Sequence, residues 1–435
     1  MNDALTPWPA PDRPSKEAGG SFDSLQTYAG ETRNLLFISH RFPYPLTKGE
    51  KIRGYKLITH FAKTYRVYLG CIVDDPADWQ HVDHLRTICT DVAAFGINRR
   101  WQKVKALAQI RPGRPLMPDY YFHPGLQRWV NHTLAHAHMD IVYIYSAAMA
   151  PYALHLQRHG KVLDMQDIDS EKWALYAQET PWPMRSIWAR EGRTLRSYER
   201  QAAAGCDATF FVTEQETKRF CELAPESAEK STWIEMGVDL ESFAPGRNLE
   251  TPYKDPGPHL VFTGSMDYRP NAEAAIWFAR EALPLLRTDW PGAQFHVVGN
   301  RPRRDVLALK KRPGVHVTGG VPDIRPYVAH ADVSVSPLRM ARGVQNKVLE
   351  AMALGKPVVA SPQAFEGIRA VAGRDLLVAD GLQATVSAVH AILTGKHPGL
   401  GAAARTAMER GYSWDKIFQK LDRWLEASLK GRVPA

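Results

Sequence analysis

Residues 341–360 read ARGVQNKVLEAMALGKPVVA, and this stretch shows the unit from which the rest of the chain is built. A glycine-containing loop leads into the helical segment NKVLEAMAL. A second glycine separates that helix from PVVA, a short apolar run typical of a buried strand. Helices that alternate with buried strands are the signature of parallel α/β proteins. The stretch therefore predicts an α/β fold.

Glu350 lies in the first turns of this predicted helix, with Lys347 and Arg342 close by. A carboxylate there can be ordinary capping chemistry, because the start of a helix carries about half a positive elementary charge. It can also bind hydroxyl groups beside an anion site, because the same helix end binds phosphate. The stretch alone leaves both interpretations open.

The alternation of apolar strands and helices occurs twice along the chain. In the first half we expect a helix at 51–64 and strands at 34–39, 66–73, 140–146, 161–166, 208–213 and 231–235. In the second half we expect helices near 271–287, 382–394 and 400–430, and strands at 260–265, 294–299, 315–319, 333–337, 357–361 and 376–379. The pattern predicts two Rossmann-like, doubly wound parallel sheets whose carboxyl edges face a cleft between two domains.

A proline-rich segment separates the two halves. Residues 241–259 contain four prolines and two glycines without apolar periodicity, which predicts a linker. We expect an N-terminal domain over 31–240, a C-terminal domain over 260–410, and a last helix within 411–435 that crosses back to the first domain. Residues 1–30 are rich in proline, serine, glycine and charge, and we expect them to form a disordered leader.

The composition narrows the class of partner. The chain has 435 residues, of which 44% are apolar and 23% charged, with a formal charge of +9 and a pI near 9.2. This excess of positive charge favours an anionic partner, such as a phosphorylated small molecule or an anionic membrane surface. The basic residues form no known nucleic-acid-reading module, so we expect no nucleic acid. The four cysteines are scattered without a C-x-x-C pair, which fits a reducing, cytoplasmic location.

One basic segment stands out. Residues 98–118 hold six lysines or arginines, no acidic residue, and Trp101. A basic, partly apolar helix with an aromatic residue near its start is typical of a helix that lies on an anionic membrane surface. A solvent-exposed helix face explains the same pattern. No apolar run reaches the roughly 20 residues that a spanning helix needs, so we expect peripheral contact at the inner face of the cytoplasmic membrane.

Several common active-site motifs are absent from the sequence. There is no G-x-x-x-x-G-K-[ST] loop and no G-x-G-x-x-G turn, which argues against a P-loop NTPase and against a nicotinamide-dependent enzyme. Neither a G-x-S-x-G turn nor an H-E-x-x-H motif occurs, so a serine hydrolase or a zinc protease lacks support.

The loop after the first predicted strand carries candidate binding residues. In SHRFPYPLTKGEKIRGYKL at 39–57, Lys48, Gly49 and Arg53 lie next to the start of a helix. A glycine permits a tight turn, and positive charge beside a helix start lets a phosphate or a charged acceptor dock. A basic surface loop is the alternative.

A second candidate edge is DMQDIDSEKW at 164–173. Asp167 and Asp169 form a D-x-D pattern, which in one class of nucleotide-sugar enzymes holds a divalent metal. Asp169 or Ser170 is equally suited to cap the following helix. We favour a polar edge that faces the cleft, and we expect no metal site.

A third candidate is the strand-to-helix turn GSMDYRPNAEA at 264–274. The small residues Gly264 and Ser265 expose backbone donors, and Arg269 adds a guanidinium just before the helix. Together they can bind a diphosphate. Pro270 is also ordinary at the first position of a helix, so the turn has a purely structural explanation too.

Five phrases in this order make the chain resemble a known family. They are VTEQE at 212–216, EMGVDLESFAP at 235–245, VFTGSMDYRPN at 261–271, VTGGVPDIRPYVAHADVSVSPLR at 317–339 and NKVLEAMALGKPVVA at 346–360. From about residue 33 to the end, the chain resembles the family-4 glycosyltransferases of the GT-B fold, which are retaining enzymes that use nucleotide sugars. The wording of RGVQNKVLEAM and FTGSMDYRPN is most similar to the sugar transferases that accompany PEP-CTERM/exosortase exopolysaccharide systems in Gram-negative bacteria.

The resemblance implies a donor-binding set in the second domain. Glu350 occupies the place of the second glutamate of the family's E-x7-E motif, which accepts hydrogen bonds from the ribose hydroxyls. The first glutamate, which contacts the donor sugar, is replaced here by Arg342, so Arg342 or its neighbours are expected to take over that contact. The donor-binding residues are then Gly264, Ser265, Arg342, Gly343, Val344, Gln345, Asn346 and Glu350.

Two further positions depart from the family pattern. The diphosphate-binding arginine aligns with Ser265, which leaves Arg269 and Lys347 as substitutes. The histidine frequently found at the end of an N-domain strand aligns with Gln166. We expect Arg269, Lys347 and Gln166 to be the catalytic residues, with Arg269 and Lys347 on the diphosphate. An acceptor and phosphate loop opposite them would include Lys48, Gly49, Arg53, Asp167 and Asp169.

The resemblance thus implies a hexosyltransferase-like enzyme. It would move a sugar from a UDP- or GDP-linked donor to a glycan or lipid-linked saccharide in exopolysaccharide biosynthesis, with retention and without a metal or other cofactor. Two alternatives remain open at this stage. One is a nucleotide-sugar epimerase of the same fold. The other is a non-catalytic nucleotide-sugar-binding scaffold, which the missing first glutamate motivates.

Overall fold

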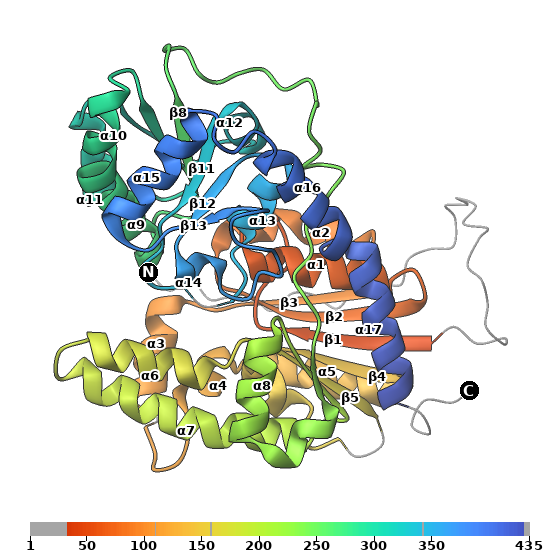
Figure 1. Ribbon diagram of the computed structural model, residues 1–435. Helices are drawn as coiled ribbons and strands as arrows, with labels where there is room; N and C mark the ends of the chain where they lie inside the picture. The colour runs from red at the N-terminus through yellow and green to blue at the C-terminus, as the bar shows by residue number, and fades with distance from the viewer. Residues whose placement is uncertain (1–32, 109, 157–158, 342, 430–435) are drawn as a thin grey trace.

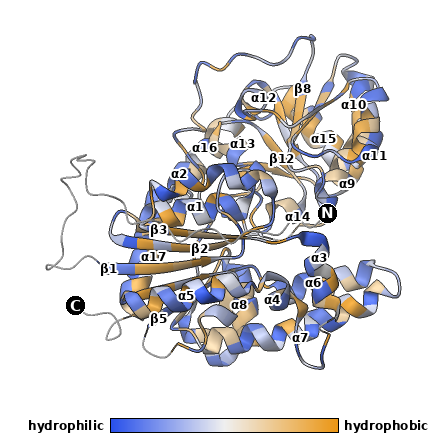
Figure 2. Ribbon diagram, turned by 180° about the vertical axis from the view of Figure 1, so that it is seen from behind, coloured by the Kyte–Doolittle hydropathy of each residue, from blue (hydrophilic) through white to orange (hydrophobic). Residues whose placement is uncertain are grey.

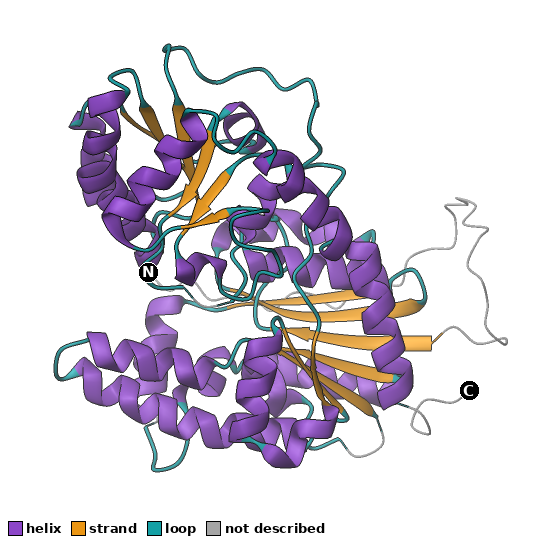
Figure 3. Cartoon of the chain, viewed as in Figure 1, coloured by secondary structure: helices purple, strands orange, loops and turns teal. Residues whose placement is uncertain are grey.

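The chain folds into two α/β domains stacked one above the other (Figure 1). The structure, a computed structural model, describes residues 33–108, 110–156, 159–341 and 343–429. The expected leader at 1–30 and Arg342 lie outside these residues. Both sheets are parallel throughout and carry helices on both faces (Figure 3).

The first domain is built on a seven-stranded sheet with the order β3-β2-β1-β4-β5-β6-β7. The chain starts in the middle of the sheet, winds outward in one direction, and returns to wind in the other. The strands are β1 (Arg33–Ser39), β2 (Tyr65–Val73), β3 (Asp91–Gly96), β4 (Ile141–Tyr145), β5 (Gly160–Gln166), β6 (Ala208–Phe211) and β7 (Ser231–Trp233). The reversal between β1 and β4 is where ligands bind in open α/β sheets.

The second domain repeats this plan with six strands in the order β10-β9-β8-β11-β12-β13. The strands are β8 (His259–Thr263), β9 (Gln294–Val298), β10 (Val315–Gly319), β11 (Val333–Ser336), β12 (Val358–Ala360) and β13 (Leu377–Val378). Two Rossmann-like sheets confirm the predicted fold class. The apolar runs are strands because central parallel strands are covered on both faces, as the buried residues of β4 show.

The helices cover both faces of each sheet (Figure 2). In the first domain the main ones are α1 (Gly49–Phe61), α3 (Arg99–Ala108), α4 (Leu116–Tyr121), α5 (Pro124–His136), α6 (Asp169–Glu179), α7 (Met184–Ala204) and α8 (Glu214–Leu223). In the second they are α9 (Arg269–Trp277), α10 (Leu283–Asp289), α13 (Asn346–Ala353), α15 (Gly381–Leu393) and α16 (Leu400–Gly411). None of the described helices is both long and apolar enough to span a bilayer.

Three details differ from the predicted elements. The sequence did not reveal β3, because it is an edge strand whose residues are mostly only half-buried and lack a strong apolar pattern. The helix predicted at 271–287 is interrupted by a π-helical turn at Phe278–Ala282. The helix predicted at 400–430 is two helices, because α16 ends at Gly411 and α17 begins at Trp414.

The last helix, α17 (Trp414–Ser428), joins the two domains. Its apolar face packs into the core of the first domain through Ile417, Phe418 and Leu421, whereas α16 before it packs in the second domain. Where the chain crosses back, the backbone N–H of Val238 donates to the carbonyl of Tyr412. Beside this bond the Trp414 ring packs on Gly237, and a Cβ added to Gly237 would lie 2.5 Å from the ring. The two passages of the chain between the domains therefore lie side by side.

The buried position of Arg53 corrects one prediction. Arg53 is 1% exposed, and its guanidinium binds the Asp164 carboxylate at 3.0 Å and the carbonyls of Ile234 and Glu235. Tyr143 donates to the same carboxylate at 2.8 Å. Arg53 therefore links α1, β5 and the segment directly after β7 in the interior of the first domain. It has no access to a ligand in the cleft.

We expect Arg53→Ala to lower the free energy of unfolding of the first domain by ~3–5 kcal/mol, because it leaves the buried Asp164 carboxylate without its partner. Urea unfolding followed by circular dichroism measures the loss. The control is Arg200→Ala, which removes an ion pair with Glu226 in which both side chains are exposed, and it should leave the midpoint nearly unchanged. Equal midpoints for the two variants would contradict the structural role of Arg53.

Candidate functional site

The carboxyl edges of the two sheets face each other, and two helix starts meet between them. Gly49 begins α1 in the first domain and Asn346 begins α13 in the second. A Cβ added to Gly49 would lie 3.1 Å from the side-chain nitrogen of Asn346. The structure therefore brings two predicted loops, one from each domain, into contact. Both helix starts present backbone N–H groups to the same space.

Two glycines of the second domain allow this close approach. Gly343 has φ +67°, and a Cβ there would lie 2.8 Å from a carboxylate oxygen of Asp167. Gly367 has φ +77°, and a Cβ there would lie 2.6 Å from the methyl group of Thr213. Positive φ together with missing space explains the need for glycine at both points. Between them, the half-buried Val344 packs against the cores of both domains.

The floor of the site in the second domain is a glycine turn. Gly264 and Gly299, both half-buried, directly follow β8 and β9 with φ +152° and φ +150°. A Cβ on Gly299 would lie 1.8 Å from the carbonyl oxygen of Gly264, so the two turns pack backbone against backbone. The turn is held by N–H donation from Gly264 to Val298 and from Met266 to Asn300. A Cβ on Gly264 would lie 2.7 Å from the side-chain nitrogen of Asn271, so glycine at this position lets polar side chains approach the backbone closely.

Lys347 points at this floor. Its ammonium donates to Asn271 Oδ1 at 2.5 Å, lies 4.7 Å from the centre of the Phe262 ring, and would lie 3.2 Å from a Cβ on Gly264. Asn271 in turn donates to the Ser265 carbonyl at 3.0 Å. Lys347, Gly264 and Ser265 are thus brought together as the sequence predicted. Asn271 was missed, although it belongs to the same FTGSMDYRPN phrase.

Burial shifts the charges of Lys347 and Glu350 in opposite directions. Both residues lie on α13, three positions apart, and both are half-buried. Removal from water lowers the pKa of Lys347 to about 7 and raises the pKa of Glu350 to about 7, and the opposite charge of the partner offsets part of each shift. The Glu350 side chain forms no hydrogen bond with any described residue. Its carboxylate is therefore available to a ligand.

The opposite wall comes from the end of β5. Gln166 has φ +68°, an uncommon conformation for a residue other than glycine, and the pairing of β5 with β6 shifts register at this point. Such strain often accompanies functional positions. Asp167 follows against Gly343, and Asp169 begins α6 with its carboxylate bonded to Lys172 at 3.0 Å. The D-x-D pair therefore lies along the edge that faces the second domain.

Lys48 also lies at this edge, at the start of α1. It is half-buried, and its pKa is lowered, first by desolvation and then by the neighbouring charge of Arg41. Arg41 bonds Glu50 at 3.1 Å. The predicted acceptor loop therefore contributes Lys48 and Gly49 to the interdomain space, whereas Arg53 of the same loop is buried below it.

Arg269 has a different environment from the one predicted. Its Nε donates to Glu273 at 2.6 Å, and a second guanidinium nitrogen lies 3.9 Å from Glu179. It lines a second cavity beside α9 together with Trp277 rather than joining Lys347 and Asn271. We therefore exclude Arg269 from the diphosphate group. The helical direction of the side chain, which the sequence does not reveal, decides this.

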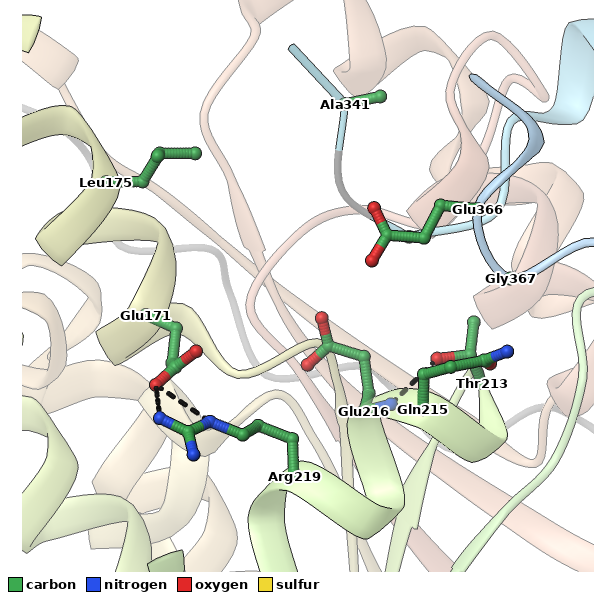
Figure 4. A pocket seen from close by; sticks show the side chains of 10 residues that line it. Glu171, Leu175, Thr213, Gln215, Glu216, Arg219, Ala341, Glu366 and Gly367 are labelled. Atoms are coloured by element: carbon green, nitrogen blue, oxygen red, sulfur yellow. Dashed lines mark hydrogen bonds and ion pairs between the residues drawn. The ribbon is translucent and has the colours of Figure 1, made fainter. Parts of the chain in front are cut away.

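A cavity of ≈ 340 Å³ lies between the domains (Figure 4). Its first-domain wall includes Thr213, Glu216 and the ion pair between Glu171 and Arg219, whose two guanidinium contacts measure 2.9 and 3.2 Å. Its second-domain wall includes Glu366, whose side chain points toward the cavity. The remaining lining residues are Leu175, Gln215, Ala341, Gly343 and Gly367. The cavity adjoins the 341–343 loop, and its wall is mainly polar.

Ion pairs across the cleft hold this arrangement, and sequence reasoning missed them. Glu235 is 5% exposed and receives Arg369 of the second domain at 2.9 Å, Lys420 of α17 at 3.1 Å and the indole N–H of Trp233 at 2.9 Å. Arg301 bonds Asp75 in the first domain. These pairs join residues far apart in sequence, so no local pattern could have found them.

No group of three histidine, cysteine or acidic residues suited to a metal occurs among the described residues.

The loop before α13 is held by its own side chain. Gln345, the residue before α13, donates a hydrogen bond from its side-chain amide to the Gly343 carbonyl at 3.1 Å and so stiffens the loop. The residues predicted to bind the donor, Gly343, Val344, Gln345, Asn346 and Glu350, therefore form one continuous structure, from the loop into the helix.

Comparisons with known proteins identify the fold. Residues 257–395 match the family model described as "Glycosyl transferases group 1". No curated protein sequence matches the chain. Three solved structures illustrate the likeness: a sucrose-phosphate synthase from Thermosynechococcus elongatus (17% identity, TM-score 0.66, 91% of this chain and 100% of that chain covered), HepE from Anabaena in complex with UDP and glucose (14%, 0.64, 91% and 100%), and WaaG, a glycosyltransferase involved in lipopolysaccharide biosynthesis (17%, 0.61, 89% and 99%). The chain has the GT-B fold, and its residues 257–395 are similar to the glycosyl transferases group 1 family.

Proposed function

We propose that the protein is a retaining glycosyltransferase that moves a sugar from a nucleoside diphosphate sugar to a saccharide hydroxyl. The observation that carries this proposal is the arrangement on α13. One ammonium lies beside a glycine turn, and one carboxylate without a hydrogen-bond partner among the described residues lies a helical turn further on. The proposal also draws on the glycosyl transferases group 1 match of the surrounding residues.

The diphosphate would bind over Gly264. The turn carries no side chain of its own, Lys347 and Asn271 lie beside it, and the start of α13 adds N–H donors and a partial positive charge. When the bond to the sugar breaks, negative charge accumulates on the diphosphate, and a fixed ammonium in a partly dry cleft stabilises it without the help of a metal. The acceptor hydroxyl would lose its proton to a phosphate oxygen of the leaving group on the same face.

Glu350 would bind the ribose. A carboxylate accepts hydrogen bonds only, so it can hold two neighbouring hydroxyl groups at once. HepE, to which the chain is similar, was solved in complex with UDP and with UDP-glucose, so UDP is the first donor base to test, and GDP the second. The donor sugar would face Gln166, the 343–345 loop and the interdomain cavity.

The acceptor would be a glycan or a lipid-linked saccharide of an exopolysaccharide pathway, reached from the cytoplasmic membrane surface. Trp101, Val104 and Leu107 of α3, and Ile110 two residues beyond its end, recur at every third position and are 43–70% exposed. Arg100, Arg111 and Arg114 are exposed nearby. An apolar helix face flanked by arginines fits an anionic membrane surface.

We expect Glu350→Ala to weaken UDP binding by roughly 1–3 kcal/mol, the usual cost of losing a hydrogen-bonding charged group. Titration calorimetry with excess chelator measures it. The control Glu222→Ala removes an exposed carboxylate on α8 and should not change the affinity. Binding that is indifferent to Glu350, or that requires added divalent metal, would point to Asp167 and Asp169 instead. Tight UDP binding without sugar transfer to any acceptor would favour the non-catalytic scaffold.

We expect the UDP affinity of the wild type to fall as the pH rises from 7 to 9. In the free protein the pKa of Lys347 is about 7, and a bound diphosphate raises this pKa, so binding takes up a proton. The affinity therefore falls by up to about tenfold for each pH unit above 7. Calorimetry at several pH values checks this. Lys347→Met should bind more weakly at pH 7 and lose this decline, and an equal decline in both proteins would rule out Lys347 as its source.

We expect Trp101→Glu combined with Leu107→Glu to reduce binding to vesicles of anionic phospholipid at least tenfold, because the variant places charge on the apolar face of α3. Vesicle co-sedimentation measures the bound fraction. Leu307→Glu, which changes a similarly exposed leucine in the second domain, is the matched control. Unchanged binding of the α3 variant would refute the membrane contact.

A further inference from the structure

A second cavity, of ≈ 610 Å³, lies outside the donor site, between α9 and the end of α6. Figure 1 shows the α6–α7 hairpin and α9 on the same side of the molecule, one from each domain. Glu179 at the end of α6 approaches Arg269 of α9 at 3.9 Å, so both domains contribute to the cavity. None of the residues proposed above to bind the nucleotide lines it.

One face of α9 lines the cavity. Arg269, Glu273 and Trp277 recur every fourth residue, which places them on one side of the helix, and Arg280 follows in the π-helical turn Phe278–Ala282. Trp277 and its neighbour Ile276, both half-buried, form the apolar floor. The π-helical turn that begins at Phe278 widens the helix directly after the indole, and such turns are frequent at functional sites.

The rim carries balanced charge. Three guanidinium groups and three carboxylates surround the apolar floor: Arg269, Arg280, Arg339, Glu179, Glu273 and Glu281. Arg269 is bonded to Glu273, but neither Arg280 nor Arg339 forms an ion pair or hydrogen bond with any described residue. A balanced rim does not attract a polyanion or an anionic bilayer, which distinguishes this cavity from the wholly basic segment 98–118.

We propose that this cavity is a subsite for the saccharide chain of the acceptor. A sugar ring has an apolar face, which can lie on the Trp277 indole, and hydroxyl groups that both donate and accept hydrogen bonds. The free guanidinium groups donate to such hydroxyls and the carboxylate of Glu281 accepts from them. An apolar floor with a few convergent polar groups is the usual form of a small-molecule site.

The loop after β11 connects this subsite to the cleft. Met340 lines the second cavity, whereas Ala341 and Gly343, a few residues later, line the interdomain cavity. The growing end of a glycan that lies along α9 would therefore point toward the donor sugar. This inference rests on the proposed transfer reaction, since it assigns the acceptor chain to a place beside the same cleft.

The test uses the full chain and an array of bacterial exopolysaccharide oligosaccharides, two to eight residues long, with dissociation constants of the bound members measured in solution. The wild type should bind at least one structural class, with affinity rising with chain length. Trp277→Ala should weaken binding at least tenfold, Trp277→Phe should retain most of it, and Arg339→Ala, at an exposed position, should weaken it without affecting folding. Leu285→Ala, an exposed residue of α10 outside the cavity, is the matched control.

UDP affinity of the same variants separates this inference from the proposed function. We expect Trp277→Ala and Arg339→Ala to bind UDP as the wild type does. Failure of the wild type to bind any oligosaccharide on the array, glycan binding that none of the cavity variants changes, or capture of peptides in preference to glycans would overturn the subsite. If the wild type does not bind UDP, the proposed donor site is refuted. The glycan measurement would then still decide by itself whether the cavity binds saccharides.

Discussion

The contact between Gly49 and Asn346 is the constraint on which the rest of the site depends. Two helix starts from different domains meet there with only 3.1 Å between the position of an absent Cβ and an amide nitrogen. Glycines at 343 and 367 permit similar contacts on either side. Because a glycine of one domain meets a short side chain of the other domain at each of these points, the two sheets present their carboxyl edges to each other at a defined distance. A ligand in the cleft therefore meets preformed walls.

Within that space, the charges of α13 are arranged by partial burial. Lys347 and Glu350 lie on one helix with shifted pKa values near neutrality, and each stabilises the charged form of the other. Isolated charges would be costly to hold there, because removal from water penalises both. Under the proposed function, the hydroxyls of a bound nucleotide would supply the hydrogen-bond partner that the Glu350 carboxylate lacks among the described residues. The diphosphate would add a negative charge beside the Lys347 ammonium, which already donates to Asn271. Nucleotide binding would therefore stabilise this part of the protein relative to the empty site.

Two groups of ion pairs centred on buried carboxylates show how the same residue types serve two purposes. Arg53 and Asp164 are withdrawn beneath the first sheet and hold α1 in place, which in turn positions Gly49. Glu235, Arg369 and Lys420 join the first domain, the second domain and α17 at one point. These contacts carry no chemistry themselves. They determine how far apart the chemical groups lie, and so they support the site from outside it.

The sequence by itself determined the two Rossmann-like sheets, because buried parallel strands leave continuous apolar runs that are local and easily recognised. It also indicated the loop and helix around Gly343 and Glu350, and the Gly264 turn, because loops at strand ends hold ligands in this class of fold. It did not reveal β3, whose half-buried residues lack the pattern, and it could not tell Arg53, which is buried, from Lys48, which is not. Only the tertiary structure decided that Arg269 bonds Glu273 rather than joining Lys347, that Glu235 joins three segments, and that α9 and α6 line a second cavity. The reason is physical: helix and strand formation depend on neighbours within a few residues, whereas the direction of a side chain and its partners in another domain depend on how whole elements pack.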